Sequence, residues 1–165
     1  MSRTPNSRKQ ETHERIVDVA ARAIRRHGYA GVGVADVMKE AGLTHGGFYA
    51  HFDSRDALLV EAYLGDEHLA SLETGCPVAA LACDMPRQSD AVREASAARV
   101  RRLVAGVQSA LPHASRATAS VVAGTLVGTL QLARALGANA EGRALLSAAR
   151  KALVQQYDAP STAAG

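Results

Sequence analysis

A run of small and polar residues follows a glycine turn in the first third of the chain. Residues 41–52 read AGLTHGGFYAHF, and Ser54 and Arg55 come shortly afterwards. Gly42 favours a tight turn, because glycine adopts a positive φ at little cost. The run predicts the end of one short helix, a turn, and a second short helix over 45–52 that buries two phenylalanines. A small helix that is apolar on one face and polar on the other can lie in the major groove of DNA.

The positive charge of the chain is concentrated around this run. The formal net charge is +3 at neutral pH. Residues 1–55 hold nine lysines and arginines against six acids, and the rest of the chain holds ten of each. The excess lies where a polyanion such as DNA would need it, although a solvated basic surface gives the same pattern.

Short helices are expected to position the run. Apolar residues recur at helical spacing and predict a helix over 10–27: Ile16, Val19, Ala20, Ala23 and Ile24. A second helix is expected over 34–41. Thr44 is expected to cap the third helix, and Asp53 or Ser54 to cap a fourth. Residues 10–62 are therefore predicted to form a helix-turn-helix domain, after a flexible basic arm over 1–9.

The rest of the chain is helical in composition and is interrupted by proline and glycine. Helices are predicted over 77–85, 90–111, 115–136 and 140–157, with Pro86 ending the first of them. The fold class is thus all-α, with a helical domain over 63–157. The tail over 158–165 is expected to be loose.

Residues 10–62 resemble the DNA-binding domain of TetR-type (tetracycline-repressor-type) transcriptional regulators. An ordered set of motifs carries the resemblance: His27-Gly28-Tyr29, Val37-Met38 before Ala41-Gly42-Leu43, Gly47-Phe48-Tyr49, His51-Phe52, and Ser54-Arg55 before Ala57-Leu58. The resemblance implies a homodimeric, cytoplasmic regulator, more often a repressor, that a small molecule releases from a near-palindromic DNA operator. It implies no enzyme activity and no cofactor.

The resemblance also implies a role for individual residues of the recognition helix. Thr44, His45, Gly46 and Ala50 would face bases or groove walls, and Gly46-Gly47 would allow a close approach to the DNA. Tyr49, His51 and Arg55 would contact phosphates, which suits their hydrogen-bond donors. Tyr49 packing against its own helix, and His51 acting as a cap or a stacking partner, are the alternatives.

The chain departs from the family pattern at two places. Val32-Gly33 stands where many relatives have a Ser or Thr that caps the second helix and touches phosphate. A long fourth helix and most of a fifth, which relatives have between positions equivalent to Ala62 and Tyr63, are missing here. We therefore expect the usual path from the effector pocket to the DNA-binding domain to be altered.

The last two long helices resemble the dimerisation helices of the family. Small residues recur every four positions, and apolar residues add contact area, so two copies could form a four-helix bundle. Intramolecular packing alone is the alternative. The predicted interface residues are Ser120, Gly124, Val127, Gly128, Leu146 and Leu153.

An effector pocket is expected among the helices that follow Gly75, with aliphatic and sulfur-containing walls. Its predicted residues are Cys76, Leu81, Cys83, Met85, Leu103, Val107, Val122 and Leu126. Cys76 lies near a predicted helix N-terminus, where a thiolate is favoured. The alternative function is accordingly a small-molecule or thiol-redox sensor whose DNA binding is impaired, although buried unreactive thiols fit the same pattern.

Other functions are disfavoured by the sequence. The six histidines have no metal-ligand spacing with the two cysteines, and no Ser/His/acid set clusters. No metal, cofactor or membrane partner is therefore expected. The most apolar segment, 117–133, includes threonines, a serine and a glutamine, and falls short of the roughly 20 apolar residues of a membrane span.

Overall fold

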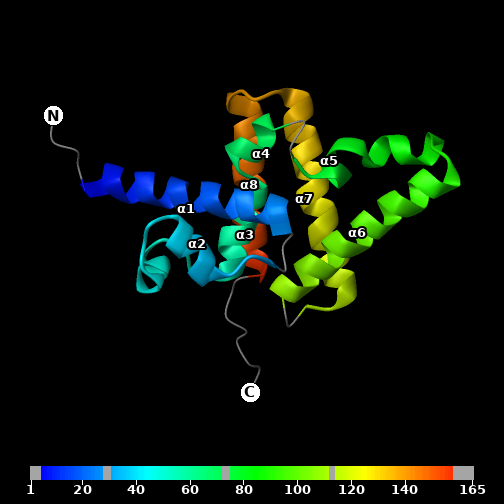
Figure 1. Cartoon of the computed structure of the whole chain (residues 1–165). Helices are drawn as coiled ribbons and strands as arrows, with labels where there is room; N and C mark the ends of the chain where they lie inside the picture. Colours follow the sequence, from blue (N-terminus) through cyan, green and yellow to red (C-terminus); the bar gives the residue numbers. More distant parts are fainter. Residues whose placement is uncertain (1–4, 28–30, 72–74, 112–113, 158–165) are drawn as a thin grey trace, which may run out of the picture.

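The computed structural model describes residues 5–27, 31–71, 75–111 and 114–157, and in these ranges the chain is helical and has no strand (Figure 1). The predicted all-α fold is confirmed. The α-helices and the 3₁₀ helices, labelled η, are α1 (Pro5–His27), α2 (Val34–Glu40), η2 (His45–Ala50), α3 (Arg55–Tyr63), α4 (Asp66–Ala70), α5 (Pro77–Leu81), η3 (Ala82–Arg87), α6 (Asp90–Ala110), α7 (Arg116–Leu136) and α8 (Ala140–Tyr157).

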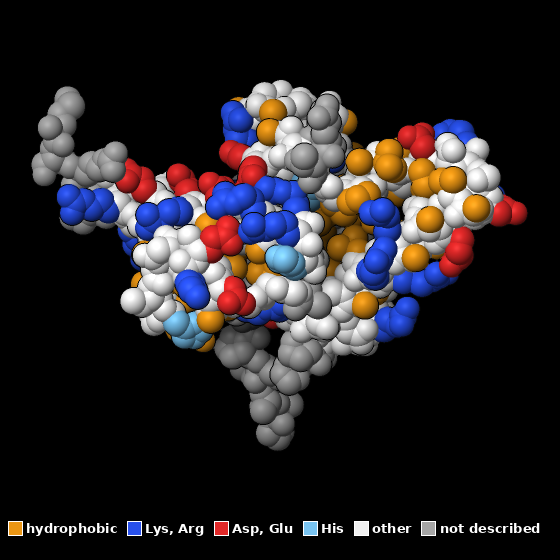
Figure 2. All heavy atoms as spheres, in the orientation of Figure 1, with side chains coloured by type: hydrophobic (Ala, Val, Ile, Leu, Met, Phe, Trp, Pro, Cys, Tyr) orange, Lys and Arg blue, Asp and Glu red, His pale blue; other side chains and the backbone are white. Residues whose placement is uncertain are grey.

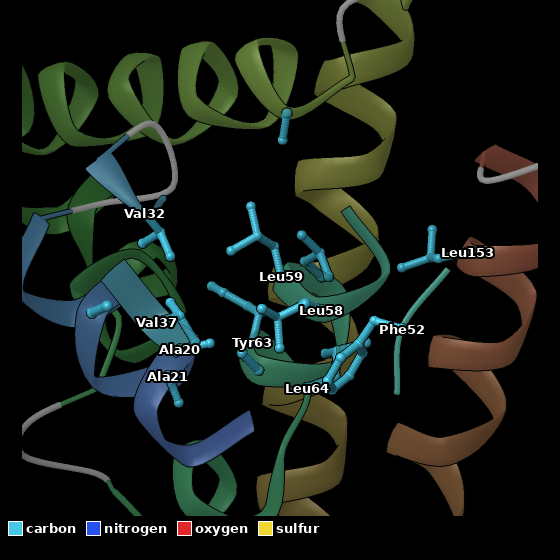
Figure 3. Close-up of a cluster of buried hydrophobic side chains, with 14 of the residues drawn as sticks. Ala20, Ala21, Val32, Val37, Phe52, Leu58, Leu59, Tyr63, Leu64 and Leu153 are labelled. Atoms are coloured by element: carbon cyan, nitrogen blue, oxygen red, sulfur yellow. The ribbon is translucent and has the colours of Figure 1, made fainter. Parts of the chain in front are cut away.

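The N-terminal helices form a small domain around α1, which we call the head. α1 packs against α2 and α3, and α2 packs against η2. The apolar stripe predicted on α1 faces this core, with Ile16, Val19 and Ala20 buried. Figure 3 shows Val37 of α2 and Leu58 of α3 converging on the same cluster. Burial of this stripe is the main force holding the head together.

The body of the molecule is built on α7, which lies between α6 and α8 (Figure 1). α7 reaches the length and mean hydropathy of a membrane span, which corrects the prediction that no segment does. One face of α7 is nevertheless core, because six of its residues are buried: Ala119, Val122, Ala123, Leu126, Leu130 and Ala133.

Helix α3 joins the head to the body without a linker. It runs unbroken through Ala62 and Tyr63, and the amide of Leu64 donates to the carbonyl of Val60 at 3.0 Å. The domain boundary expected at 62/63 therefore falls inside a helix. α3 packs on α1 at one side and on α8 at the other, so a single rigid element connects both parts.

Several predicted helix ends are confirmed by side-chain caps. Ser54 accepts from the amide of Ala57 and Ser115 from that of Thr118, each at 3.0 Å. Asn139 Oδ1 accepts from two amides at the start of α8. Such caps satisfy amides that have no partner inside the helix.

Other predicted ends were wrong. α1 begins at Pro5, so residues 5–9 are helical rather than a flexible arm, since proline suits the first helical turn. Thr44 occupies the predicted N-cap position of η2 but makes no side-chain cap bond. Pro86 lies inside η3 and does not end a helix over 77–85. The predicted tail over 158–165 lies outside the described residues.

Candidate nucleic-acid interface

The predicted recognition helix is a short 3₁₀ helix, η2, and not an α-helix over 45–52. The amide of Gly47 donates to the carbonyl of Thr44 at 3.1 Å, and that of His51 to Phe48 at 2.9 Å, in the three-residue pattern of a 3₁₀ turn. Gly46-Gly47 has low helix propensity, which favours this tighter form over an α-helix. Gly42 makes the preceding turn with a φ of +72°.

Two buried phenylalanines fix the orientation of η2. Phe48 is 1% exposed and its ring stacks on that of Phe52 at a centroid distance of 5.6 Å. His13 of α1 also stacks on Phe52, at a centroid distance of 4.4 Å, and its Nε2 lies 2.7 Å from Glu61 Oε2 on α3. η2 is therefore held by α1 and α3 together.

The polar face of η2 points to solvent, in the part of the head drawn at the lower left of Figure 2. Tyr49 is 70% exposed, the largest exposure among the large hydrophobic side chains described. Of the predicted DNA-contact residues, Thr44, His45, Gly46 and Ala50 are solvent-accessible as well, and Gly47 is half-buried beside Met38. These residues form one accessible surface around Tyr49.

His51 does not share this exposed surface. Its ring lies 6.2 Å from that of His13, and its Nδ1 is buried without a hydrogen-bond partner among the described residues. Burial, followed by the nearby His13 and Lys9, lowers the pKa of His51. This shift favours the neutral imidazole, and the ring lies tilted beside that of His13 on α1.

Arg55 holds the backbone of the head. Its Nε donates to the carbonyl of Val32 at 2.9 Å, and its Nη1 lies 3.8 Å from Asp56 Oδ1. Arg55 thereby fixes the segment that leads into α2 at Gly33. The guanidinium acts at least in part as a positioning group, which the sequence analysis did not predict.

The predicted effector-pocket residues separate into two groups. Val107, Val122 and Leu126 line one apolar cavity of about 30 Å³, together with Leu59 of α3 and Tyr157 of α8. The other predicted residues do not line this cavity: Cys76, Leu81, Cys83, Met85 and Leu103. Leu81 and Cys83 are exposed, so the predicted sulfur-lined wall is absent from this cavity. The described residues hold no group of three or more potential metal ligands.

The predicted dimer residues also fall into two groups, one buried inside the protomer and one accessible to solvent. Leu146 and Leu153 are 0% and 5% exposed; they pack inside the protomer and cannot contact a second copy. Ser120 and Gly124 are exposed, and Val127 and Gly128 are half-buried. Large apolar side chains that the sequence analysis missed are exposed on the same helix: Val121, Leu132 and Leu136.

Comparison with known proteins agrees with this geometry. Residues 16–62 match the family described as "Bacterial regulatory proteins, tetR family". The HTH-type transcriptional regulator AcrR of Shigella flexneri is 32% identical over 74 residues, which cover 44% of this chain and 34% of that protein. The HTH-type transcriptional regulator TtgR of Pseudomonas putida is 38% identical over 68 residues, 41% of this chain and 32% of that protein.

The chain spans about a third of the length of these two curated relatives. A solved TetR transcriptional regulator from Chloroflexus aurantiacus J-10-FL aligns over 93% of this chain and 97% of its own, at 22% identity and a TM-score of 0.39. That likeness is too weak to bear on function.

The matched residues 16–62 comprise the C-terminal half of α1, then α2, η2 and most of α3. In this segment, 47 of the 165 residues, the chain is similar to TetR-family regulators, as its motifs predicted. His27-Gly28-Tyr29 includes residues outside the described part of the structure.

Proposed function

We propose that this protein is a homodimeric DNA-binding transcriptional repressor of the cytoplasm, without enzyme activity, which a small molecule releases from a near-palindromic operator. The observation that carries the proposal is the exposed polar face of η2 on its two buried phenylalanines, within the segment that matches the family. His45 and Tyr49 are both exposed on that face. An element of this kind can enter the major groove while the rest of the head rests on the backbone.

In the proposed complex some residues of the head contact bases and others contact phosphates. Duplexes selected by the wild-type protein from a random pool supply the probe. We expect His45→Ala to change the preferred sequence. We expect Tyr49→Phe to weaken binding to all duplexes by about tenfold, because it removes one hydroxyl donor to a phosphate oxygen. Fluorescence anisotropy of labelled duplexes, measured at two salt concentrations, gives both results.

Tyr157→Phe, measured without any effector, is the matched control, because it removes a phenol hydroxyl at the C-terminal end of α8 and keeps the ring that lines the cavity. Wild-type affinity should fall steeply between low and moderate salt. Equal losses for Tyr49→Phe and Tyr157→Phe, or a duplex preference that His45→Ala leaves unchanged, would contradict the assigned contacts.

The homodimer rests on the open face of α7. Val121, Gly124, Gly128 and Leu132 are spaced so that they share one side of the helix. A Cβ added at either glycine would meet nothing within 4 Å, and both Val121 and Leu132 are 62% exposed. Two such faces can approach closely about a two-fold axis.

We expect Leu132→Glu to convert the dimer to a monomer and to weaken operator binding, because the charge would be desolvated in the interface. Sedimentation velocity at several concentrations measures the change. Val92→Glu, on the exposed part of α6, is the control and should remain a dimer. A wild-type protein that sediments as a monomer at all concentrations would remove this part of the proposal.

The cavity beneath α3 supports a small apolar effector. The cavity is lined by Val107, Val122 and Leu126 together with residues of α3, the helix that follows η2. A ligand bound there would press directly on α3. The cavity of about 30 Å³ holds little more than a water molecule, and a ligand would therefore have to separate α8 from α3. Release of the selected duplex by small apolar compounds tests this part.

A further inference from the structure

A cluster of charged and polar groups joins the head to the body at α4. Arg25 of α1 donates to Glu67 of α4. His68 follows Glu67 and is 4% exposed. Arg134 of α7 donates through Nη2 to the backbone carbonyls of His68 and Ser71, at 2.8 and 3.0 Å. We call Arg25, Glu67, His68 and Arg134 the junction cluster.

His68 fixes the position of α4 with both ring nitrogens. Nδ1 lies 2.8 Å from the carbonyl of Tyr63, and Nε2 lies 2.9 Å from the amide of Cys76. A carbonyl only accepts and an amide only donates, so Nδ1 carries the proton and Nε2 accepts. Burial lowers the pKa of His68 to about 4. The ring is therefore neutral and ties the end of α3 to the start of α5.

Within the described residues Arg134 is bonded to backbone carbonyls and forms no ion pair with a carboxylate, and its Nε is buried without a hydrogen-bond partner there. A Cβ at Gly75 would lie 2.5 Å from the carbonyl oxygen of Ser71 and 2.8 Å from Arg134 Nη2. The chain therefore passes close enough to the guanidinium that only glycine fits at position 75.

These contacts form a continuous path from the body to the DNA-binding face. A shift of α7 would move the two carbonyls that Arg134 holds, and with them α4. Glu67 would pass that shift to α1 through Arg25. α1 in turn holds η2 through the stack of His13 on Phe52. These charge-assisted hydrogen bonds are part-buried, and bonds of this kind are short and hold their partners in a defined geometry.

We propose that Arg134 is a positioning residue for the head: through the junction cluster it sets where α1, and hence η2, lies relative to the body. The inference rests on the proposed function, because it concerns the geometry of the DNA-binding face. It adds a route from body to head that does not pass through α3.

Two different variants test this role. Arg134→Met removes the donors, and Gly75→Ala leaves every charge in place but adds a Cβ that would push against both the Ser71 carbonyl and the Arg134 guanidinium. Each should weaken binding to the selected duplex by about tenfold, while binding to non-specific DNA at low salt stays unchanged. Arg143→Met is the matched control, since Arg143 also donates to a backbone carbonyl, that of Ala138, away from the junction; it should bind as the wild type does.

A double-mutant cycle shows whether Glu67 and Arg134 act through one shared set of contacts or affect DNA binding independently. Glu67→Gln combined with Arg134→Met should bind DNA no more weakly than the worse single variant, because both break one path. Fully additive losses would overturn the inference. So would an affinity loss accounted for by the unfolded fraction alone, measured by urea denaturation.

Amide hydrogen exchange tests the positioning role of Arg134 without requiring that the protein bind DNA. Arg134→Met should increase exchange in the C-terminal half of α1 as well as in α4, and Arg143→Met should not. Should the wild-type protein bind no duplex, the proposed function fails and this measurement still decides the positioning role. Increased exchange in α4 with α1 unchanged would contradict it.

Discussion

Replacing Phe48 by alanine is expected to lower the free energy of unfolding by about 3–5 kcal/mol. The ring is almost completely buried and packs edge-on against Tyr49 and in a stack with Phe52. Its loss leaves a cavity under η2, where two glycines offer no side chains to fill it. We therefore expect the exposed face of η2 to lose its orientation and DNA binding to disappear.

Urea denaturation followed by circular dichroism measures this effect. The control is Tyr49→Ala, which removes a larger side chain from a solvent-exposed position and should lower stability by no more than about 1.5 kcal/mol, the value of its edge-on contact with Phe48. A Phe48→Ala protein as stable as the wild type would mean that η2 is not held by its phenylalanines, and the site described above would lose its physical basis.

Acidification between pH 6.5 and pH 4 is expected to remove about 2–3 kcal/mol of stability through His68 alone. Its pKa is about 4 in the folded protein and near the usual 6.5 in the unfolded chain. The unfolded chain therefore binds the proton first as the pH falls. The contribution of the neutral ring is complete above pH 6.5 and is lost as the pH falls through this window.

The matched variant is His68→Gln, which keeps one donor and one acceptor but does not titrate. It should be less stable than the wild type at neutral pH, with the difference shrinking towards pH 4. Taking the difference between the two proteins cancels the other groups whose pKa values shift, Asp18 and His51 among them. A difference that stays constant with pH would show that the ring is not buried as described.

Local signals in the sequence predicted much of the fold. The stripe from Ile16 to Ala23 indicated the buried side of α1, because helical periodicity reports burial directly. Ser54 is one of the two predicted caps of α3, because it precedes an apolar periodic segment, whereas the predicted helix over 115–136 includes Ser115, which the structure places as the cap of α7. The prediction failed at Gly46-Gly47. The pattern indicated an α-helix, but the low helix propensity of glycine and the short length of the segment favoured a 3₁₀ helix.

The sequence could not predict which distant side chains and backbone groups contact one another in the folded protein. Leu146 and Leu153 lie at helical spacing, but spacing cannot say whether the covering surface belongs to the same chain or to a second copy. Arg55 bonds to a carbonyl 23 residues away, and Arg134 to one 66 residues away. His13 could have been noticed, because it continues the α1 stripe one turn before Ile16; its stack on Phe52 could not.

The 3₁₀ form of η2 limits how much sequence information one head can extract. The six residues of η2, at about 2.0 Å each, extend about 12 Å, and base pairs along a duplex are about 3.4 Å apart. One head would therefore contact about three to four base pairs. A given DNA sequence of that length recurs about once in every hundred positions. A genome with about 10⁶ or more competing positions would offer roughly 10⁴ matches to a single head. In the proposed dimer two heads at a fixed separation would multiply their discrimination, so that addressing one promoter would be a property of the assembly and not of the fold.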